Sequence, residues 1–595
     1  MRDEWRQYCR KKTVGVNDSD SPKPFTESEL EEVLRSIKSG TAAGYDNISP
    51  EFLKHLGPKA KSWLAAFYTR IVQERRMPRA WRQAKVIAIP KPGKDPNVAA
   101  SYHPISLLSV SFKLLERLIL QRIRPELENT IIVEQAGFRQ GRSTCDQVLA
   151  LTTFIENGYQ KNLKTGTVFL DLTAAYDTVW HAGLLTKLSR LMPRWVVETI
   201  ELFLRNRRFR VHMGDKCSSW RRQMNGLPQG SVLSPSLFNV YINDLPVTQA
   251  RKFIYADDIC LGTQSNAFTE LEGVLNKDME MMAEYLTKWR LQPSANKTVS
   301  SVFHLHNAKA DHELNILLQG QHIKHDPHPV YLGVTLDRSL TYHEHLKKTA
   351  AKITTRNNLL SKLAGTSWGA SAQTLKTTAL ALCYSTAEYC APVWSRSSHT
   401  KLVDVQLNTS MRTITGTLRS TPLPWLPVLS NIPPPHLRRQ EAAAKLLAKV
   451  NANDRLPLRE DILSHPKALL SSRRPVWLDP PPEGMRANSA WSLEWSTTDV
   501  VNCSLVAEPS VCPPGFDLPR QSWTMLNRFR TGQGRCAVNL VRWGQATDPN
   551  CSCGKLQTMS HIVNDCPLTH FTGGLPVLHL AGDDAIRWLG TQRKR

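Results

Sequence analysis

Two hydrophobic patterns divide the chain. Short continuous apolar runs, such as residues 84–89, are typical of buried strands, whereas apolar residues spaced three or four positions apart are typical of amphipathic helices. Residues 26–29 read Thr-Glu-Ser-Glu, a capping box that starts such a helix, and residues 30–37 supply its apolar face. A longer apolar stripe runs through residues 271–289. The pattern predicts an α+β protein that is mainly helical and has a few buried strands.

Two of the predicted strand segments carry carboxylates where the apolar run stops. Residues 253–261 consist of two apolar runs joined through Asp257 and Asp258, which predicts a hairpin with both acids at its tip. Residues 167–170 form another apolar run, and it ends at Asp171. An acidic pair alone is common in solvated turns. Three carboxylates at the ends of buried strands instead predict a site for a divalent cation.

Two loops add candidate binding groups. Residues 91–94 read Lys-Pro-Gly-Lys and follow the strand 84–89, so two ammonium groups lie on a tight turn. Such a turn suits phosphate binding and is equally an ordinary solvated turn. Residues 225–239 lead from a loop rich in glycine and proline into a helix. This loop would let the backbone approach a ligand closely, and its alternative is a plain connection to the helix.

The balance of charged residues indicates which class of molecule the protein binds. The 595 residues include 76 Lys+Arg against 52 Asp+Glu, a formal net charge of +24. This charge favours a polyanion such as nucleic acid, with a merely soluble basic surface as the alternative. No apolar stretch reaches the roughly 18 to 20 residues that span a bilayer, and the N-terminus lacks a signal-peptide core. We expect an intracellular protein without a membrane partner, and its twelve cysteines to be reduced.

Ordered sequence blocks carry a family resemblance. The blocks are residues 85–94, 102–108, 137–144, the segment around Asp171, the segment from Gly226, the segment around Tyr255, and residues 331–337. In this order they resemble the reverse transcriptases of non-long-terminal-repeat retrotransposons, the long-interspersed-element class, and most closely the jockey group. Group II intron and retron polymerases share the acidic hairpin. They fit less well at residues 137–144, at residues 234–245 and in the cysteine-bearing tail.

The resemblance implies a right-hand polymerase: fingers, a palm with an antiparallel sheet and a helical thumb, followed by a mainly helical C-terminal region. The implied segments are an N-terminal extension (1–25), the helical N-terminal part of the fingers (26–80), the reverse transcriptase fingers and palm (81–337), the thumb and helical connection (338–475), a proline-rich linker (476–519) and a C-terminal region with a Cys/His knuckle (520–595).

The resemblance also implies roles for individual residues. Asp171, Asp257 and Asp258 would be the catalytic acids and would bind two Mg²⁺ ions, which activate the primer 3′-hydroxyl and hold the incoming triphosphate. Leu332 and Gly333 match the primer-grip hairpin. Tyr176 matches the steric gate against a ribose 2′-hydroxyl, and Lys297 matches a lysine that protonates the leaving pyrophosphate. The implied nucleotide-binding set is Lys85, Lys91, Lys94, His103, Tyr176, Gln229, Gly230 and Lys297.

One position departs from the family pattern. The block at residues 102–106 normally reads Tyr-Arg-Pro-Ile-Ser, but this chain has His103 in place of the arginine. Histidine is mostly neutral near pH 7 and lacks the permanently charged, bidentate fork of arginine. Two explanations stay open. The chain is a drifted copy with impaired catalysis, or Lys85, Lys91 or Lys94 compensates for the arginine.

The C-terminal tail holds a candidate zinc knuckle. Cys551, Cys553, His561 and Cys566 have the ligand types of a tetrahedral Cys3His site, although the usual Cys-x-x-Cys opening is replaced by Cys-x-Cys. Resemblance to the family favours zinc, with template RNA or target DNA as the ligand of the knuckle.

Two functional hypotheses follow. The first is an RNA-directed DNA polymerase that copies element RNA by target-primed synthesis, with template RNA, primer or target DNA and deoxynucleoside triphosphates as partners. The second is a catalytically impaired or domesticated nucleic-acid-binding derivative. About 25 residues precede the first capped helix, too few for the endonuclease that the family usually carries, so none is expected in this chain. The expected location is the nucleus, a cytoplasmic ribonucleoprotein, or both. The sequence specifies neither an oligomeric state nor a target site.

Overall fold

The computed structural model describes residues 22–365, 368–467, 470 and 475–592, so most of the expected N-terminal extension (1–25) lies outside the described residues. The described chain divides into two compact units. The first comprises Met1–Gln147, Lys164–Val302 and Lys309–Asp326, and the second comprises Val148–Leu163, Phe303–Ala308 and Pro327–Arg595. The α+β prediction is confirmed, because helices predominate and strands form sheets in the first unit. Among the described helices, none combines the length and apolar character required to cross a bilayer.

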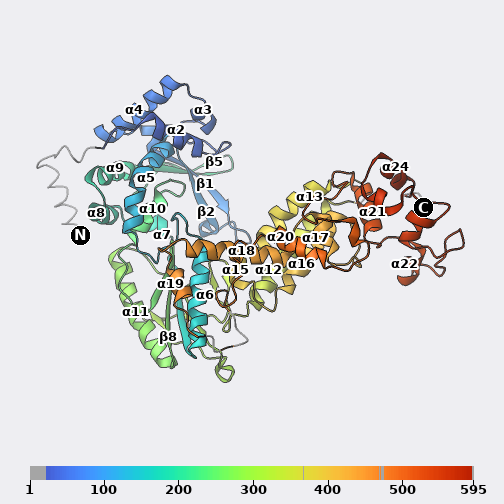
Figure 1. The fold of residues 1–595 in the computed structure, drawn as a ribbon. Coiled ribbons are helices and arrows are strands. Elements are labelled where there is room, and N and C mark those ends of the chain that lie inside the picture. Colours follow the sequence, from blue (N-terminus) through green and yellow to red (C-terminus); the bar gives the residue numbers. More distant parts are fainter. Residues whose placement is uncertain (1–21, 366–367, 468–469, 471–474, 593–595) are drawn as a thin grey trace, which may run out of the picture. The chain divides into compact units, whose positions relative to one another are not determined.

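The first unit contains a five-stranded sheet in the order β12-β9-β3-β8-β7. Its strands are β3 (Lys164–Leu170), β7 (Arg251–Tyr255), β8 (Asp258–Ser265), β9 (Val299–Phe303) and β12 (Lys324–His325). The pairs β3–β8 and β7–β8 are antiparallel, and β12–β9 is parallel. The long helix α11 (Phe268–Lys288) packs against β3 and β8, and the apolar stripe predicted from residue 271 supplies its buried side (Figure 1).

A second sheet in this unit has the order β2-β1-β4-β5, with β6 paired to β4. Its strands are β1 (Gln83–Pro90), β2 (Tyr102–Leu107), β4 (Arg208–Met213), β5 (Lys216–Cys217) and β6 (Arg221–Arg222). The predicted strand 84–89 is therefore confirmed. It pairs antiparallel with β2 and parallel with β4, a strand more than a hundred residues later in the chain.

Helices surround both sheets of the first unit. They are α2 (Glu27–Ser36), α3 (Pro50–Lys54), α4 (Pro58–Glu74), α5 (Val110–Thr130), α7 (Ala175–Thr178), α8 (His181–Leu191), α9 (Arg194–Leu204) and α10 (Ser234–Tyr241). The capping box at α2 forms as predicted, since the Glu29 N–H donates to Thr26 Oγ1 at 3.2 Å and the Thr26 N–H donates to Glu29 Oε2 at 2.8 Å. The apolar side chains of Leu30, Val33 and Leu34 then enter the core.

The second unit is almost entirely helical. Its helices are α6 (Thr144–Gln160), whose first residues belong to the first unit, then α12 (His343–Lys362), α13 (Ala372–Ala379), α14 (Ser385–Ala387), α15 (Ala391–Trp394), α16 (Lys401–Thr415), α17 (Trp425–Ser430), α18 (Pro435–Asn451), α19 (Pro457–Leu463), α20 (Ala487–Ser496), α21 (Arg520–Arg530), α22 (Ala537–Arg542), α23 (Gly574–His579) and α24 (Asp583–Thr591). A short antiparallel hairpin, β13 (Val330–Tyr331) and β14 (Val334–Thr335), precedes α12.

The proline-rich segment 476–519, expected to be a linker, contains a packed helix. Trp491 and Trp495 of α20 are buried, and they belong to one apolar cluster with Trp425. The Trp425 and Trp495 rings meet edge to face with centroids 5.3 Å apart. Part of this segment is therefore folded onto the helices before it rather than forming an open connection.

Candidate active site

Three carboxylates meet at one edge of the five-stranded sheet. The β3–β8 ladder ends with Leu170 opposite Ile259, so Asp171 and Asp258 occupy the next positions on neighbouring strands. The β7–β8 hairpin closes at the pair Tyr255 and Asp258, which leaves Ala256 and Asp257 as a two-residue turn. Ala256 has a positive φ of 56°, as such tight turns require. The predicted hairpin and the predicted convergence of the three acids are both confirmed.

The hairpin turn is held from outside by Gln135, a residue that no sequence motif marked. Its side-chain oxygen accepts hydrogen bonds from the N–H groups of Ala256 at 2.8 Å and Gly137 at 2.7 Å, and its Nε2 donates to the Ala256 carbonyl at 3.2 Å. Gly137 approaches so closely that a Cβ there would lie 2.2 Å from the Ala256 nitrogen. These contacts fix the backbone that carries Asp257.

Asp171 is anchored by the segment that follows α11. Its N–H donates to Thr298 Oγ1 at 3.2 Å, and its carbonyl accepts from the Ser294 N–H at 2.8 Å. The same segment brings Lys297 to the site, with Nζ 3.4 Å from Asp171 Oδ2. The Lys297 side chain is 67% exposed, so its ammonium group can move toward a ligand without breaking core packing. The structure therefore places Lys297 beside the acids.

Burial and mutual repulsion disfavour the ionised acids when no cation is present. Burial, and next the charge of Asp171, raises the pKa of Asp257. Burial, followed by the charges of Asp257 and Asp171, raises the pKa of Asp258 to about 6. A cluster of carboxylates that repel one another is the donor set that a hard divalent cation such as Mg²⁺ neutralises. The three acids thus fit the ligands that magnesium requires.

Burial of these acids, together with their repulsion, predicts a pH-dependent stability. A carboxyl group with a raised pKa in the folded state binds more protons than in the unfolded state, so folding stability falls as pH rises from about 4 to about 6. We expect Asp258→Asn to raise Tm at pH 7 without divalent cations, and this gain to disappear near pH 4. Thermal melts across pH in a chelating buffer measure the effect. A gain that is the same at every pH would contradict this origin.

Tyr176 forms one wall beside the acids. Its ring stacks on Phe238 with centroids 4.6 Å apart and meets Phe138 edge to face at 6.4 Å. Burial, and next the charge of Asp257, raises the pKa of the Tyr176 hydroxyl. That hydroxyl is buried and has no hydrogen-bond partner among the described residues. The ring is therefore fixed in place next to Asp257, and its role as a steric gate stays a prediction.

The loop before α10 approaches the strand β2. The Gln229 carbonyl accepts from the Ser106 N–H at 2.8 Å, and Gln229 Nε2 lies 3.4 Å from both carboxylate oxygens of Asp177. Gly230 has φ +122°, and a Cβ on it would lie 2.5 Å from the Ser106 carbonyl oxygen. Only glycine fits this position without moving the backbone. Both predicted loop residues are thus held on the strand that also carries His103.

The predicted basic residues Lys85 and His103 lie on the second sheet. In the β1–β2 ladder Lys85 pairs with Leu107 and Ile89 pairs with His103, so both basic residues lie on the same face. His103 is exposed.

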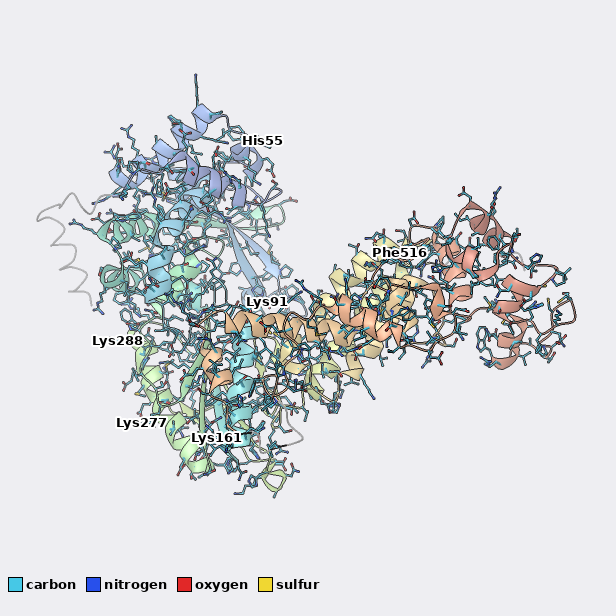
Figure 2. The ribbon with its side chains drawn as sticks, in the orientation of Figure 1. His55, Lys91, Lys161, Lys277, Lys288 and Phe516 are labelled. Carbon is cyan, nitrogen blue, oxygen red and sulfur yellow. The ribbon has the colours of Figure 1, made fainter. Side chains whose placement is uncertain are left out.

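The predicted turn at residues 91–94 follows β1, where Figure 2 labels Lys91. Gly93 has φ +72°, and the Lys94 N–H donates to the Lys91 carbonyl at 3.3 Å. Lys94 is exposed on this turn, which leaves its ammonium group available to a phosphate.

Leu332 and Gly333 form the two-residue turn of the β13–β14 hairpin in the second unit. Both have positive φ, 46° and 82°. The Tyr389 hydroxyl donates to the Leu332 carbonyl at 2.7 Å, and a Cβ on Gly333 would lie 3.3 Å from the Tyr389 ring. The predicted tight hairpin is confirmed, and its contact with primer stays a prediction.

The four predicted zinc ligands come together in the second unit. Cys551 and Cys566 have their Sγ atoms 3.7 Å apart, and Cys553 Sγ lies 3.2 Å from His561 Nε2. All four ligand atoms lie within 4.8 Å of one another. Sulfurs about 2.3 Å from a tetrahedral zinc are about 3.8 Å apart, so this cluster fits the ion. Gly554, with φ +85°, forms a turn after Cys553, and the chain then leads back to His561.

Comparison with known proteins assigns this geometry to a class. Residues 89–336 match the family described as reverse transcriptase (RNA-dependent DNA polymerase). This segment, which contains all three acids, is a reverse transcriptase domain.

The curated relatives are RNA-directed DNA polymerases of mobile elements. The chain is 36% identical over 341 residues to the probable RNA-directed DNA polymerase from transposon BS of Drosophila melanogaster. The aligned region covers 56% of this chain and 38% of that protein. It is 33% identical over 344 residues to the RNA-directed DNA polymerase from mobile element jockey of Drosophila funebris, covering 56% of this chain and 37% of the relative. The chain therefore spans less than half the length of either relative.

Another relative extends the similarity along the chain. The putative 115 kDa protein in type-1 retrotransposable element R1DM of Drosophila melanogaster is 25% identical over 472 residues, which is 75% of this chain and 44% of that protein. The similarity is thus longer than the reverse transcriptase domain itself.

Proposed function

We propose that the chain is an RNA-directed DNA polymerase of a non-LTR retrotransposon, built as a right hand whose palm is the sheet carrying Asp171, Asp257 and Asp258. The observation that carries the proposal is the convergence of these three acids at the end of β3 and the tip of the β7–β8 hairpin. Two bound magnesium ions would supply activation of the primer 3′-hydroxyl and stabilisation of charge on the triphosphate. The residues of the chain hold the ions and orient the substrates.

Three neighbouring residues have separate tasks in this proposal. The Tyr176 ring, clamped against Phe238, excludes a ribose 2′-hydroxyl from the nucleotide site by volume. Gln229 contacts the incoming nucleotide from a loop whose backbone is bonded to β2. The Lys297 ammonium group, 3.4 Å from Asp171, is a proton donor to the leaving pyrophosphate.

A basic and aromatic surface on the second sheet supports a nucleic-acid partner. Arg210 pairs with Lys85 across β1 and β4, and its guanidinium group lies 5.3 Å from the centroid of the Trp220 ring. Tyr45 packs against Trp220 at 5.3 Å, and its hydroxyl is 2.9 Å from His212 Nε2. Cationic groups beside aromatic rings suit phosphate contact and base stacking, so this surface fits template RNA or primer DNA.

Primer extension tests the proposal against its alternative. A DNA primer annealed to an RNA template should be extended by deoxynucleoside triphosphates when magnesium is present, and chelation should stop the reaction. The alternative function is a nucleic-acid-binding protein without catalysis, and His103 is the residue that favours it. Binding of the same template–primer without extension, under conditions where a reference reverse transcriptase extends it, would establish that alternative.

His103→Arg is expected to raise kcat/KM for nucleotide incorporation. Arginine restores a charged fork on the exposed face of β2, and a charge-assisted hydrogen bond to phosphate contributes about 1 kcal/mol more than a neutral one, or about fivefold. Steady-state extension on one template–primer gives the two values. His103→Gln serves as the control for size and hydrogen bonding without charge. Equal efficiency of the arginine variant and the unchanged protein would mean that the lysines nearby already supply the charge.

The wider activity is also part of the proposal. We propose that synthesis is primed by the 3′ end of nicked target DNA, with element RNA as template, and that the Cys/His cluster contacts one of these nucleic acids. This activity would take place in the nucleus, with the RNA-bound protein passing through the cytoplasm. Incubating the protein with element RNA and pre-nicked target DNA should give cDNA joined covalently to the nicked strand. Products primed only on free oligonucleotides would oppose target priming.

A further inference from the structure

A buried pair of opposite charges lies beneath the loop that carries Gln229 and Gly230. Glu116, on α5, and Arg207, between α9 and β4, are each 2% exposed. Arg207 Nη1 donates to the Phe203 carbonyl at 3.1 Å, but Nε and Nη2 have no hydrogen-bond partner among the described residues. Leaving two donors of a fully buried guanidinium group without acceptors costs folding free energy. The space around Arg207 should therefore contain a group that accepts these hydrogen bonds.

Both side chains line one small cavity. It has a volume of about 20 Å³ and is lined by Glu116, Arg207, Phe112, Pro228 and Ser231 among others. A cavity of this size holds one water molecule, and a water needs two to four polar partners. The free Arg207 nitrogens and the Glu116 carboxylate supply such partners. Burial lowers the pKa of Arg207 to about 10, and the charge of Glu116 opposes that shift. Burial raises the pKa of the Glu116 carboxyl, and its bonds to Ser231 and Val232 and the charge of Arg207 oppose that shift, so each group favours the charged form of the other.

Glu116 also binds the loop directly. The Ser231 hydroxyl donates to Glu116 Oε1, and the Val232 N–H donates to Oε2 at 3.0 Å. On the opposite side of Gly230, the Gln229 carbonyl accepts from the Ser106 N–H at 2.8 Å. Gln229 and Gly230 therefore lie between two anchors, one on a strand and one on a buried carboxylate. Movement of the second anchor would displace both residues.

We propose that Glu116 and Arg207, bridged by one buried water, form a clamp that positions the Gln229 loop for the incoming nucleotide. The inference rests on the proposed polymerase function, since it gives Glu116 the role of a positioning residue for that site. A buried charge pair often contributes little net stability compared with apolar side chains. The clamp therefore acts on the geometry of the loop more than on the stability of the fold.

Hydrogen exchange tests the clamp without relying on catalysis. In Glu116→Gln the side-chain shape is kept and the charge is lost, so the amides of residues 226–234 should exchange at least about tenfold faster while other amides of the first unit keep their rates. The matched control is Glu198→Gln. Glu198 is another buried acid of the same unit, 4% exposed, and it forms ion pairs with Arg194 and Arg75.

Steady-state kinetics provides the second readout. Because the loop positions the nucleotide, Glu116→Gln should raise KM for deoxynucleoside triphosphates by about five- to tenfold, with a smaller change in kcat. If this variant does not fold, Ser231→Ala removes one of the two loop bonds and should show the same pattern more weakly. Unchanged loop exchange, or faster exchange throughout the unit, would overturn the clamp. Absence of nucleotide incorporation by the unchanged protein would overturn the proposed function alone, since the exchange result still decides the clamp.

Discussion

Asp257→Asn is expected to reduce nucleotide incorporation by about a thousandfold. Asp257 is at the two-residue tip of the hairpin, and its carboxylate completes the acidic cluster with Asp171 and Asp258. An amide keeps the size of the side chain but removes a negative charge from the proposed magnesium site. Metal ions at such sites contribute several kcal/mol to the transition state, and about 4 kcal/mol corresponds to a factor of about a thousand. Single-nucleotide incorporation under saturating primer and template measures the loss.

Two controls separate a catalytic loss from a folding defect. Asp311→Asn is the matched substitution at an exposed aspartate of the same unit, and it should leave incorporation unchanged. Binding of template–primer by Asp257→Asn should also be retained, because the basic surface on the second sheet is untouched. Residual activity above about a tenth of the unchanged protein would rule out Asp257 as a ligand needed for catalysis.

The positions of the three acids could be predicted because local patterns place them. Apolar runs fixed the strand segments around Asp171 and Asp257, and the two acids beside each other required a turn. The family resemblance then supplied roles for Tyr176 and Lys297, which the structure places near Asp257 and Asp171 through charge and contact. Local sequence patterns are sufficient to place a residue when the element that carries it begins and ends at residues that the pattern itself marks.

The supporting contacts could not be predicted because they join distant parts of the chain. Gln135 holds a turn 121 residues away, and Glu116 holds a loop 115 residues away. Neither residue stands in a distinctive local pattern. The parallel pairing of β1 with β4 depends on the helices that fold between them. Such pairings are set by how whole elements pack, and no local periodicity encodes them.

The segment 476–519 also shows that packing between distant residues cannot be predicted from local sequence. Its prolines indicate an extended linker, and proline does exclude a helix at residues 480–482. Composition cannot show, however, that Trp491 and Trp495 have a tryptophan to pack against at residue 425. Burying such rings contributes more than the local preference for an extended chain costs.

Removal of zinc is expected to unfold the C-terminal Cys/His cluster. Structural zinc sites bind the ion with about 10 kcal/mol or more of free energy, which is also folding energy for the segment they close. The C-terminal part of the segment is also packed, since Met559 and Val563 are buried, whereas the turn that carries Cys551 and Cys553 is closed by bonds such as that from the Cys551 N–H to the Lys555 carbonyl at 2.7 Å. The loss of order should therefore begin at this turn. The full-length protein should contain one equivalent of zinc by elemental mass spectrometry. A strong chelator should make this segment sensitive to protease while the first unit stays resistant.

Cys553→Ser should remove the zinc and produce the same protease sensitivity without chelator. Cys512→Ser is the matched control, because Cys512 is exposed and lies outside the cluster. Thiolates are the binding form, so zinc retention by the unchanged protein should fall as pH decreases. If the unchanged protein contains no zinc and the chelated protein keeps its protease resistance, the four residues are a packed cluster with no metal. Contact of the knuckle with RNA or DNA would then require another explanation.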